Sequence, residues 1–158
     1  MRVLLDTNAV ISALLFGGSP RKLLRLLCND PFELWTSRPL LRELAATLSH
    51  QKLASALDQS GLTVETLVQA YASQTFVVSD AALEPVEFAP DPSDQVVLAA
   101  AQAAHADWLV TGDRHLLDAS EIIHSTVLTV AKRLLVLASF SSGQPRQTRR
   151  PSLSAASR

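Results

Sequence analysis

The sequence predicts an α/β protein in which helices cover both faces of a central, mainly parallel sheet of about four to five strands. Short apolar segments alternate along the chain with stretches of helical periodicity. Continuous apolar strands of this kind are typical of parallel sheets that are buried on both faces. Hydrophobic residues make up 47% of the 158 residues and charged residues 18%, so the chain has the composition of a globular domain.

The apolar patterns and turn residues place each element. Strands are expected at Arg2–Leu5, Phe32–Thr36, Phe76–Ser79, Asp107–Thr111 and Ile122–His124. Helices are expected at Ala9–Leu15, Pro20–Cys28, Ser37–Leu48, Gln51–Asp58, Val64–Ser73, Asp91–Ala104 and Thr126–Ala138, with a short helical turn at Arg114–Leu117. Ser37, Thr63 and Asp91 stand where N-cap residues are expected. The prolines at 85 and 90 predict a loop over Asp80–Pro90.

The chain length suggests one domain. We assign it to residues 1–140 and expect the Ser/Arg/Pro/Gln-rich tail, residues 141–158, to be disordered. Cys28 is the one cysteine, which excludes an internal disulfide and fits a reducing cytoplasm. The strand-like start leaves no room for a signal peptide, and no apolar run reaches the length of a membrane span. We therefore expect a cytoplasmic protein that does not enter the membrane.

The charge is unevenly distributed. Four of the 14 basic residues are arginines of the tail, so residues 1–140 carry 10 basic against 15 acidic residues. An acidic body is unusual for a protein that only binds nucleic acid. It is compatible with a metal site, where the ion supplies positive charge.

Acidic side chains stand at separate places where strands end or helices begin. Asp6 and Asp113 each follow an apolar strand, and the carboxyl ends of parallel strands form the functional edge of such sheets. Asp94 lies above Val97 and Leu98 on the apolar face of its helix. Helix capping explains part of each position. An unpaired charge on a buried face is costly, however, and a metal would compensate it.

Other acids have weaker arguments from position alone. Glu43 lies well off the centre of the apolar stripe of its helix, where most glutamates are solvated. Asp80 ends the third strand and Asp91 is most simply an N-cap, although either could join the acidic cluster.

Other chemistries lack their motifs. The single cysteine and the four scattered histidines show no zinc spacing. The sequence has no Walker loop, no GxGxxG and no GxSxG element. Arg21, Lys22 and Arg25 form a basic patch on one helix, which is either a solvated face or a phosphate contact.

Three segments resemble the PIN-domain family: LLDTNAVISALL at the start, LLREL in mid-chain, and DPSDQVVLAAAQAAHADWLVTGDRHLL. The resemblance covers residues 1–135 and is closest to PIN proteins described as toxins of toxin–antitoxin pairs. Two features depart from close relatives. Gln95 stands where they often carry asparagine, and residues 123–135 lack a Pro–Phe pattern.

The resemblance implies a PIN-like three-layer α/β/α fold and a metal-dependent ribonuclease. The family's acids match Asp6, Glu43, Asp94 and Asp113, so Glu43 enters the site by resemblance. Asn8 and Thr111 fall where the family has polar residues near the site, and Asp91 is a candidate outer-shell group. The oxygen-only ligand set favours Mg²⁺ or Mn²⁺. Arg21, Lys22 and Arg114 are candidate RNA contacts, and a cognate antitoxin and a second copy of the chain are the expected protein partners.

Two other classes of function remain open at this stage. A non-catalytic PIN-like module would bind RNA or a protein through the same fold. An Asp-based phosphoryl-transfer enzyme or receiver domain would use Asp6 as its nucleophile, but the usual second acid is replaced by Thr7 and Asn8.

Overall fold

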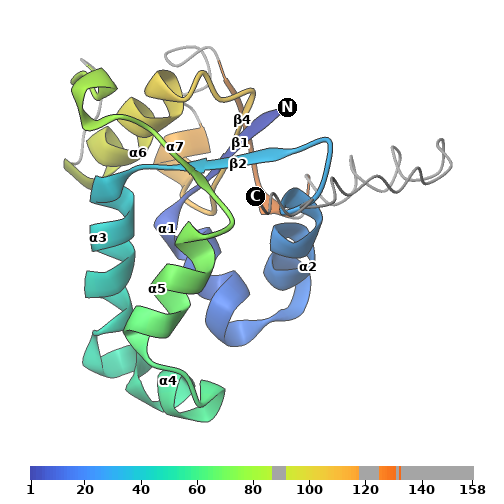
Figure 1. Cartoon of the computed structure of the whole chain (residues 1–158), viewed down its shortest axis with the longest axis vertical. Coiled ribbons are helices and arrows are strands. Elements are labelled where there is room, and N and C mark those ends of the chain that lie inside the picture. Colours follow the sequence, from blue (N-terminus) through green and yellow to red (C-terminus); the bar gives the residue numbers. More distant parts are fainter. Residues whose placement is uncertain (87–91, 118–124, 131, 133–158) are drawn as a thin grey trace, which may run out of the picture.

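The computed structural model describes residues 1–86, 92–117, 125–130 and 132 (Figure 1). Within these residues, five parallel strands form one sheet in the order β3-β2-β1-β4-β5. The strands are β1 Arg2–Leu5, β2 Glu33–Thr36, β3 Phe76–Val77, β4 Trp108–Val110 and β5 Thr126–Leu128. The helices are α1 Thr7–Ile11, α2 Gly18–Leu27, α3 Arg38–Leu48, α4 Ala54–Ser60, α5 Val64–Ala72, α6 Pro92–Ala103 and α7 Arg114–Leu117. A π-helical segment η1 (Ser12–Phe16) and 3₁₀ turns η2 (Gln51–Leu53) and η3 (Asp80–Ala82) complete the described elements. The predicted fold class is confirmed.

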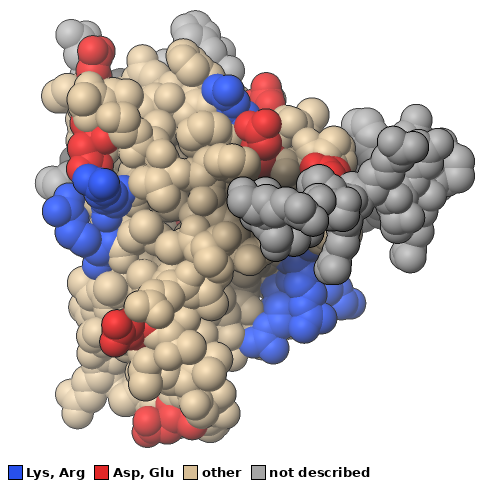
Figure 2. All heavy atoms as spheres, viewed as in Figure 1, with Lys and Arg blue, Asp and Glu red and all other residues tan. Residues whose placement is uncertain are grey.

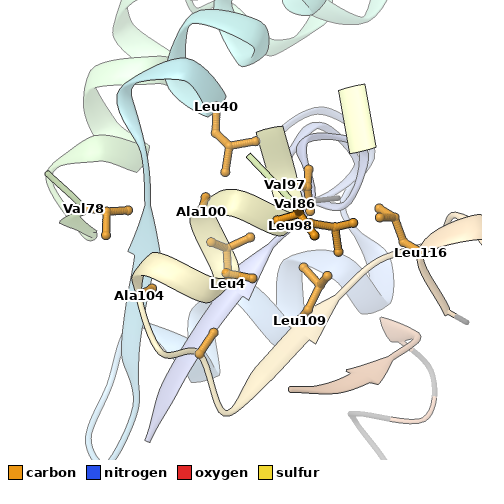
Figure 3. Packing of buried hydrophobic residues seen from close by; sticks show 12 residues of the cluster. Leu4, Leu40, Val78, Val86, Val97, Leu98, Ala100, Ala104, Leu109 and Leu116 are labelled. Carbon is orange, nitrogen blue, oxygen red and sulfur yellow. The ribbon is translucent and has the colours of Figure 1, made fainter. Parts of the chain in front are cut away.

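Alternating side chains of the central strand divide the interior into two cores. Val3 and Leu5 pack against one set of helices, which includes α1, α2 and α5. Leu4 points to the other face, where α6 and α7 pack (Figure 3). All three side chains are at most 4% exposed, as the period of two along a strand predicts for a sheet that is covered on both faces.

Helix α3 contributes to both cores. Leu44 and Leu48 belong to the core beneath α1 and α5, whereas Leu40 packs with Val97 of α6 in the other core (Figure 3). The helix therefore lies at the side of the sheet and is enclosed by α1, α5 and α6.

The expected N-caps of two helices are confirmed. The Ser37 hydroxyl accepts a hydrogen bond from the Leu40 backbone N–H at 3.3 Å, and Thr63 accepts one from the Thr66 N–H at 3.1 Å. Both residues have extended backbone, as N-caps do.

The last strand corrects the prediction. Residues 126–128 were expected to begin a helix, but they form β5, which pairs with β4 in the register Trp108↔Thr126. Thr126 and Val127 are β-branched, and tertiary pairing decided the conformation of this short segment. Val130 and Lys132 are helical.

Several expectations lie outside the described residues. These are the strand at Ile122–His124, the cap at Asp91, most of the last helix and the tail from residue 141, so the domain limit at residue 140 stays a prediction. Within the described ranges, no helix has the length and apolar character required to cross a membrane.

The core assignment predicts that replacing a buried and an exposed leucine by alanine lowers the free energy of unfolding by different amounts. Leu44 is 2% exposed and Leu26, on α2, is 47% exposed. Leu44→Ala should lower the free energy of unfolding by about 2–5 kcal/mol, because it removes buried methyl groups and leaves a cavity. Leu26→Ala should change it by less than about 1 kcal/mol. Urea denaturation of both variants measures this, and equal losses would contradict the assignment.

Candidate active site

Asp6 follows the central strand at the carboxyl edge of the sheet. Its backbone N–H donates to the Val110 carbonyl at 2.9 Å and so extends the pairing of β1 with β4 by one residue. The Thr111 hydroxyl donates to Asp6 Oδ2, also at 2.9 Å. Asp6 is 5% exposed and Thr111 is fully buried, so this bond fixes the carboxylate inside the protein.

Hydrogen bonds connect Asp6 to the turn that carries Asp113. Thr111 Oγ1 accepts the Asp113 backbone N–H at 2.9 Å while it donates to Asp6. Asp113 Oδ1 in turn accepts the backbone N–H of His115 at 2.9 Å. One threonine therefore holds the carboxylate of the first strand and the turn after the fourth strand in a fixed relation.

The surroundings of Asp6 favour its neutral form. Burial raises the pKa of the Asp6 carboxyl, and the nearby charge of Asp113 raises it further. The Thr111 hydroxyl and the backbone N–H groups of Asn8 and Thr7 oppose this rise in pKa without cancelling it. A buried carboxylate beside another acid is the electrostatic environment that a bound cation relieves.

Glu43 faces this group from α3. Burial raises the pKa of its carboxyl, and the charge of Asp6 raises it further, while the Thr7 hydroxyl lowers it. Glu43 is half-buried, although its helical position alone predicted a solvated side chain. Because α3 packs against α1 as well as α5 and α6, a side chain outside the leucine stripe is also covered.

Asp94 lies in the first turn of α6 and is 7% exposed. The opposite end of this helix lies at the amino edge of the sheet, because the Ala104 carbonyl accepts a hydrogen bond from Arg2 Nη1 at 3.0 Å. The first turn of α6 is therefore directed toward the carboxyl edge. In the core beside it, Val97 of α6 packs with Leu40 of α3, one turn away from Asp94 and Glu43 respectively.

An open depression of about 550 Å³ adjoins Asp113. It is lined by Asn8, Gly112, Asp113, Arg114 and His115. Asn8 and Arg114 are exposed. The depression therefore combines a carboxylate, an amide and a cationic side chain at the edge where Asp6 is buried.

Two of the candidate RNA contacts differ in their surroundings. Figure 2 shows Lys and Arg side chains gathered over α2, which carries Arg21, Lys22 and Arg25. Arg21 donates from Nε to the Ala13 carbonyl at 3.0 Å and from Nη2 to the Leu14 carbonyl at 2.8 Å. Its guanidinium is thus hydrogen-bonded to the backbone of η1, whereas Lys22 is exposed and forms no such bond among the described residues.

The other acids considered from the sequence do not join the cluster in the described part of the chain. Asp80 Oδ2 accepts a hydrogen bond from Arg38 Nη1 at 3.3 Å in an exposed ion pair, and Asp91 lies outside the described residues.

Position alone did not identify Thr7 as a site residue. It is 4% exposed, and its hydroxyl forms no hydrogen bond of normal geometry although it lies near Glu43. The sequence signal was its place directly after Asp6.

The donor chemistry fits a hard divalent cation. Among the residues that the structure describes, no three His, Cys, Asp or Glu side chains are close enough to enclose an ion by themselves. Mg²⁺ keeps several water ligands and takes one or two carboxylates directly, so it does not require such a cage. Asp6 with Glu43 or Asp113, beside the buried Thr7 hydroxyl, supplies oxygen ligands of this kind.

A larger hollow of about 900 Å³ lies elsewhere, between η1, α2, α4 and α5. Its lining is largely apolar, with Arg21, Arg25 and Lys52 as its charged residues. It contains none of the four candidate acids and is separate from the site.

The chain is a parallel three-layer α/β/α protein with buried carboxylates at the carboxyl edge of its sheet. The model of the PIN domain family matches residues 2–115, and the chain belongs to this family. No curated protein matches the sequence.

Two solved structures share the fold. One is VapBC2 from Rickettsia felis bound to a DNA fragment from its promoter, with a TM-score of 0.56, 19% identity, and coverage of 82% of this chain and 98% of that chain. The other is a PilT N-terminus domain protein from Sulfolobus solfataricus, with a TM-score of 0.52, 11% identity, and coverage of 95% and 100%. At these identities the similarity establishes the fold.

The raised pKa of Asp6 predicts a pH-dependent gain in stability for Asp6→Asn. Because the folded pKa lies above the ordinary value of 3.8, the contribution of Asp6 to stability is present at low pH. It is lost as the pH rises through the folded pKa. Asparagine keeps an acceptor for Thr111 but carries no charge. In the presence of a chelator, Asp6→Asn should therefore unfold at a higher temperature than wild type at neutral pH. This difference in unfolding temperature should disappear at acidic pH.

Thermal unfolding between pH 3 and 8 tests this difference, with Asp58→Asn as the control because Asp58 is exposed on α4. A less stable Asp6→Asn variant at pH 7 would contradict the assigned environment.

Proposed function

We propose that the protein is a divalent-metal-dependent endoribonuclease that hydrolyses RNA phosphodiester bonds. The observation that carries the proposal is the buried carboxylate of Asp6, which lies near the acids Asp113 and Glu43 at the carboxyl edge of a parallel sheet. Membership of the PIN domain family supports a nuclease activity. Mg²⁺ or Mn²⁺ is the proposed cofactor.

The proposed metal-binding residues are Asp6, Glu43, Asp94 and Asp113. A bound ion would lower the pKa of a water molecule and stabilise the departing oxygen. Thr111 orients the Asp6 carboxylate through its hydroxyl. Asn8 lines the depression where the RNA backbone would enter, and Asp91 stays a proposed supporting group.

Exposed basic side chains would hold the RNA backbone. Arg114 lines the depression beside Asp113, and Lys22 is exposed on α2. Arg21 is the weaker candidate, because its guanidinium already donates to two backbone carbonyls.

Replacement of the central acid should abolish cleavage. Asp6→Asn should lower the rate of RNA cleavage with Mg²⁺ or Mn²⁺ by more than about 100-fold, since groups that only support a metal ligand already contribute about 10–100-fold. Cleavage of mixed RNAs by the purified variant measures this, with Asp58→Asn as the matched control.

Wild-type protein treated with a chelator should lose activity and regain it on addition of Mn²⁺. Cleavage by Asp6→Asn at the wild-type rate would refute the metal-site proposal. Binding of Mn²⁺ and RNA by wild type without any cleavage would instead support a non-catalytic PIN-like module.

Two neighbouring basic residues should respond differently to the same substitution. Lys22→Gln should weaken RNA binding and reduce the salt dependence of binding by about one phosphate contact, with little effect on unfolding. Arg21→Gln should lower the free energy of unfolding by about 1–2 kcal/mol, because two carbonyls lose a charged donor. Filter binding at several salt concentrations and thermal unfolding separate the two effects, and an unchanged salt slope for Lys22→Gln would exclude it as a contact.

We further propose that the enzyme is the toxin of a toxin–antitoxin pair and acts in the cytoplasm. The structural similarity to VapBC2, a complex bound to a fragment of its promoter, supports this context. The expected partners are RNA, a cognate antitoxin protein and a second copy of the chain. Expression of the chain with and without the product of an adjacent short reading frame tests the pairing. Equal growth inhibition in the two cultures would contradict it.

A receiver-like function with Asp6 as a phosphorylated nucleophile has less support. The carboxylate is 5% exposed and is hydrogen-bonded to Thr111, so it is poorly placed to attack a phosphoryl donor.

A further inference from the structure

Gln95 is bonded to both backbone groups of one residue in another segment. Its Oε1 accepts the Val86 backbone N–H at 2.9 Å, and its Nε2 donates to the Val86 carbonyl oxygen. A carboxamide is the uncharged side-chain group that can both donate and accept in this way. Gln95 thus binds the segment before α6 much as a neighbouring strand would.

The bonded segment is itself fixed in the core. Val86 is 5% exposed and packs with Val97 and Leu98 of α6 (Figure 3). Gln95 therefore connects the first turns of α6 to a buried anchor through polar bonds, in addition to the apolar contact. The two attachments together restrict both the position of the helix end and its rotation about the helix axis.

The rotation of this helix end determines where Asp94 lies. Adjacent residues of a helix project about 100° apart, so a small rotation carries the Asp94 carboxylate toward or away from the sheet edge. Asp94 is buried and lies in the same turn as Gln95. The other end of α6 is fastened at the amino edge of the sheet by Arg2, roughly 15 Å away at a rise of 1.5 Å per residue.

We propose that Gln95 is a positioning residue for Asp94: its paired hydrogen bonds with Val86 set the orientation in which Asp94 takes part in metal binding. The inference rests on the proposed function, since it assigns Asp94 to the metal site. An asparagine side chain is one methylene shorter and would not span the same two groups from the same backbone position.

The test compares one substitution at two places on α6. Gln95→Met keeps the length of the side chain and removes both hydrogen bonds. Gln102→Met is the matched control, since Gln102 is exposed on the same helix. Gln95→Met should bind Mn²⁺ about 10-fold more weakly by titration calorimetry, in the range for groups that orient a ligand, and Gln102→Met should bind it like wild type.

A second comparison separates orientation from general destabilisation. If Gln95 acts through Asp94, Gln95→Met should cost little additional Mn²⁺ affinity in an Asp94→Asn background, so the two losses should not add. Thermal unfolding in a chelator reports the structural cost independently. Gln95→Asn, which keeps the amide but shortens its reach, replaces the methionine variant if that variant does not fold.

Each outcome decides between the proposals. A lower unfolding temperature with unchanged Mn²⁺ affinity would make Gln95 only structural and overturn the inference, as would additive losses with Asp94→Asn. If wild type binds Mn²⁺ and cleaves RNA while Gln95→Met does the same with equal affinity, the inference fails and the proposed function stands. If wild type binds no Mn²⁺, both fail.

Discussion

The pairing of β1 with β4 is the constraint on which the site depends. It continues beyond the strands, because the Asp6 N–H bonds to the Val110 carbonyl and the Thr111 hydroxyl bonds to the Asp6 carboxylate. In a parallel pair both chains leave the sheet at the same edge, so two acids distant in sequence start their turns side by side. The helices around the sheet bury Asp6 at this edge, and α3 and α6 carry Glu43 and Asp94.

This arrangement withdraws the carboxyl groups of Asp6 and Glu43 from water. Burial and neighbouring carboxylates raise the pKa of both Asp6 and Glu43, so ionisation of each costs more free energy in the metal-free protein than in water. The two leucine-rich cores supply the opposing stabilisation on either side of the sheet. A site that lowers the stability of its own fold is expected where a ligand supplies the missing charge.

The sequence was sufficient for features encoded locally and insufficient for those decided by packing. Apolar strands followed by Asp6 and Asp113 predicted that both acids lie at the carboxyl edge of the sheet, and the caps at Ser37 and Thr63 were correctly placed. The apolar stripe of α3 could not predict that Glu43 is half-buried, because α1, α5 and α6 contact this helix on several sides. In the same way, the basic pattern of α2 could not reveal that Arg21 donates to the Ala13 and Leu14 carbonyls of η1. Residues 126–128 carried too short a pattern to distinguish a strand from a helix start.

Under the proposed function, the charge of the acidic residues couples RNA binding to metal binding. Phosphodiester groups approaching Asp6, Glu43 and Asp113 meet carboxylates inside a protein whose formal net charge is −1. Arg114 beside the depression offsets only part of this repulsion, because it is exposed and screened by solvent. A divalent cation among the acids would cancel much of their negative charge and so reduce the repulsion of a phosphate. RNA affinity and metal affinity are then linked and reinforce each other. Under the proposed function, RNA binding would therefore depend on the metal.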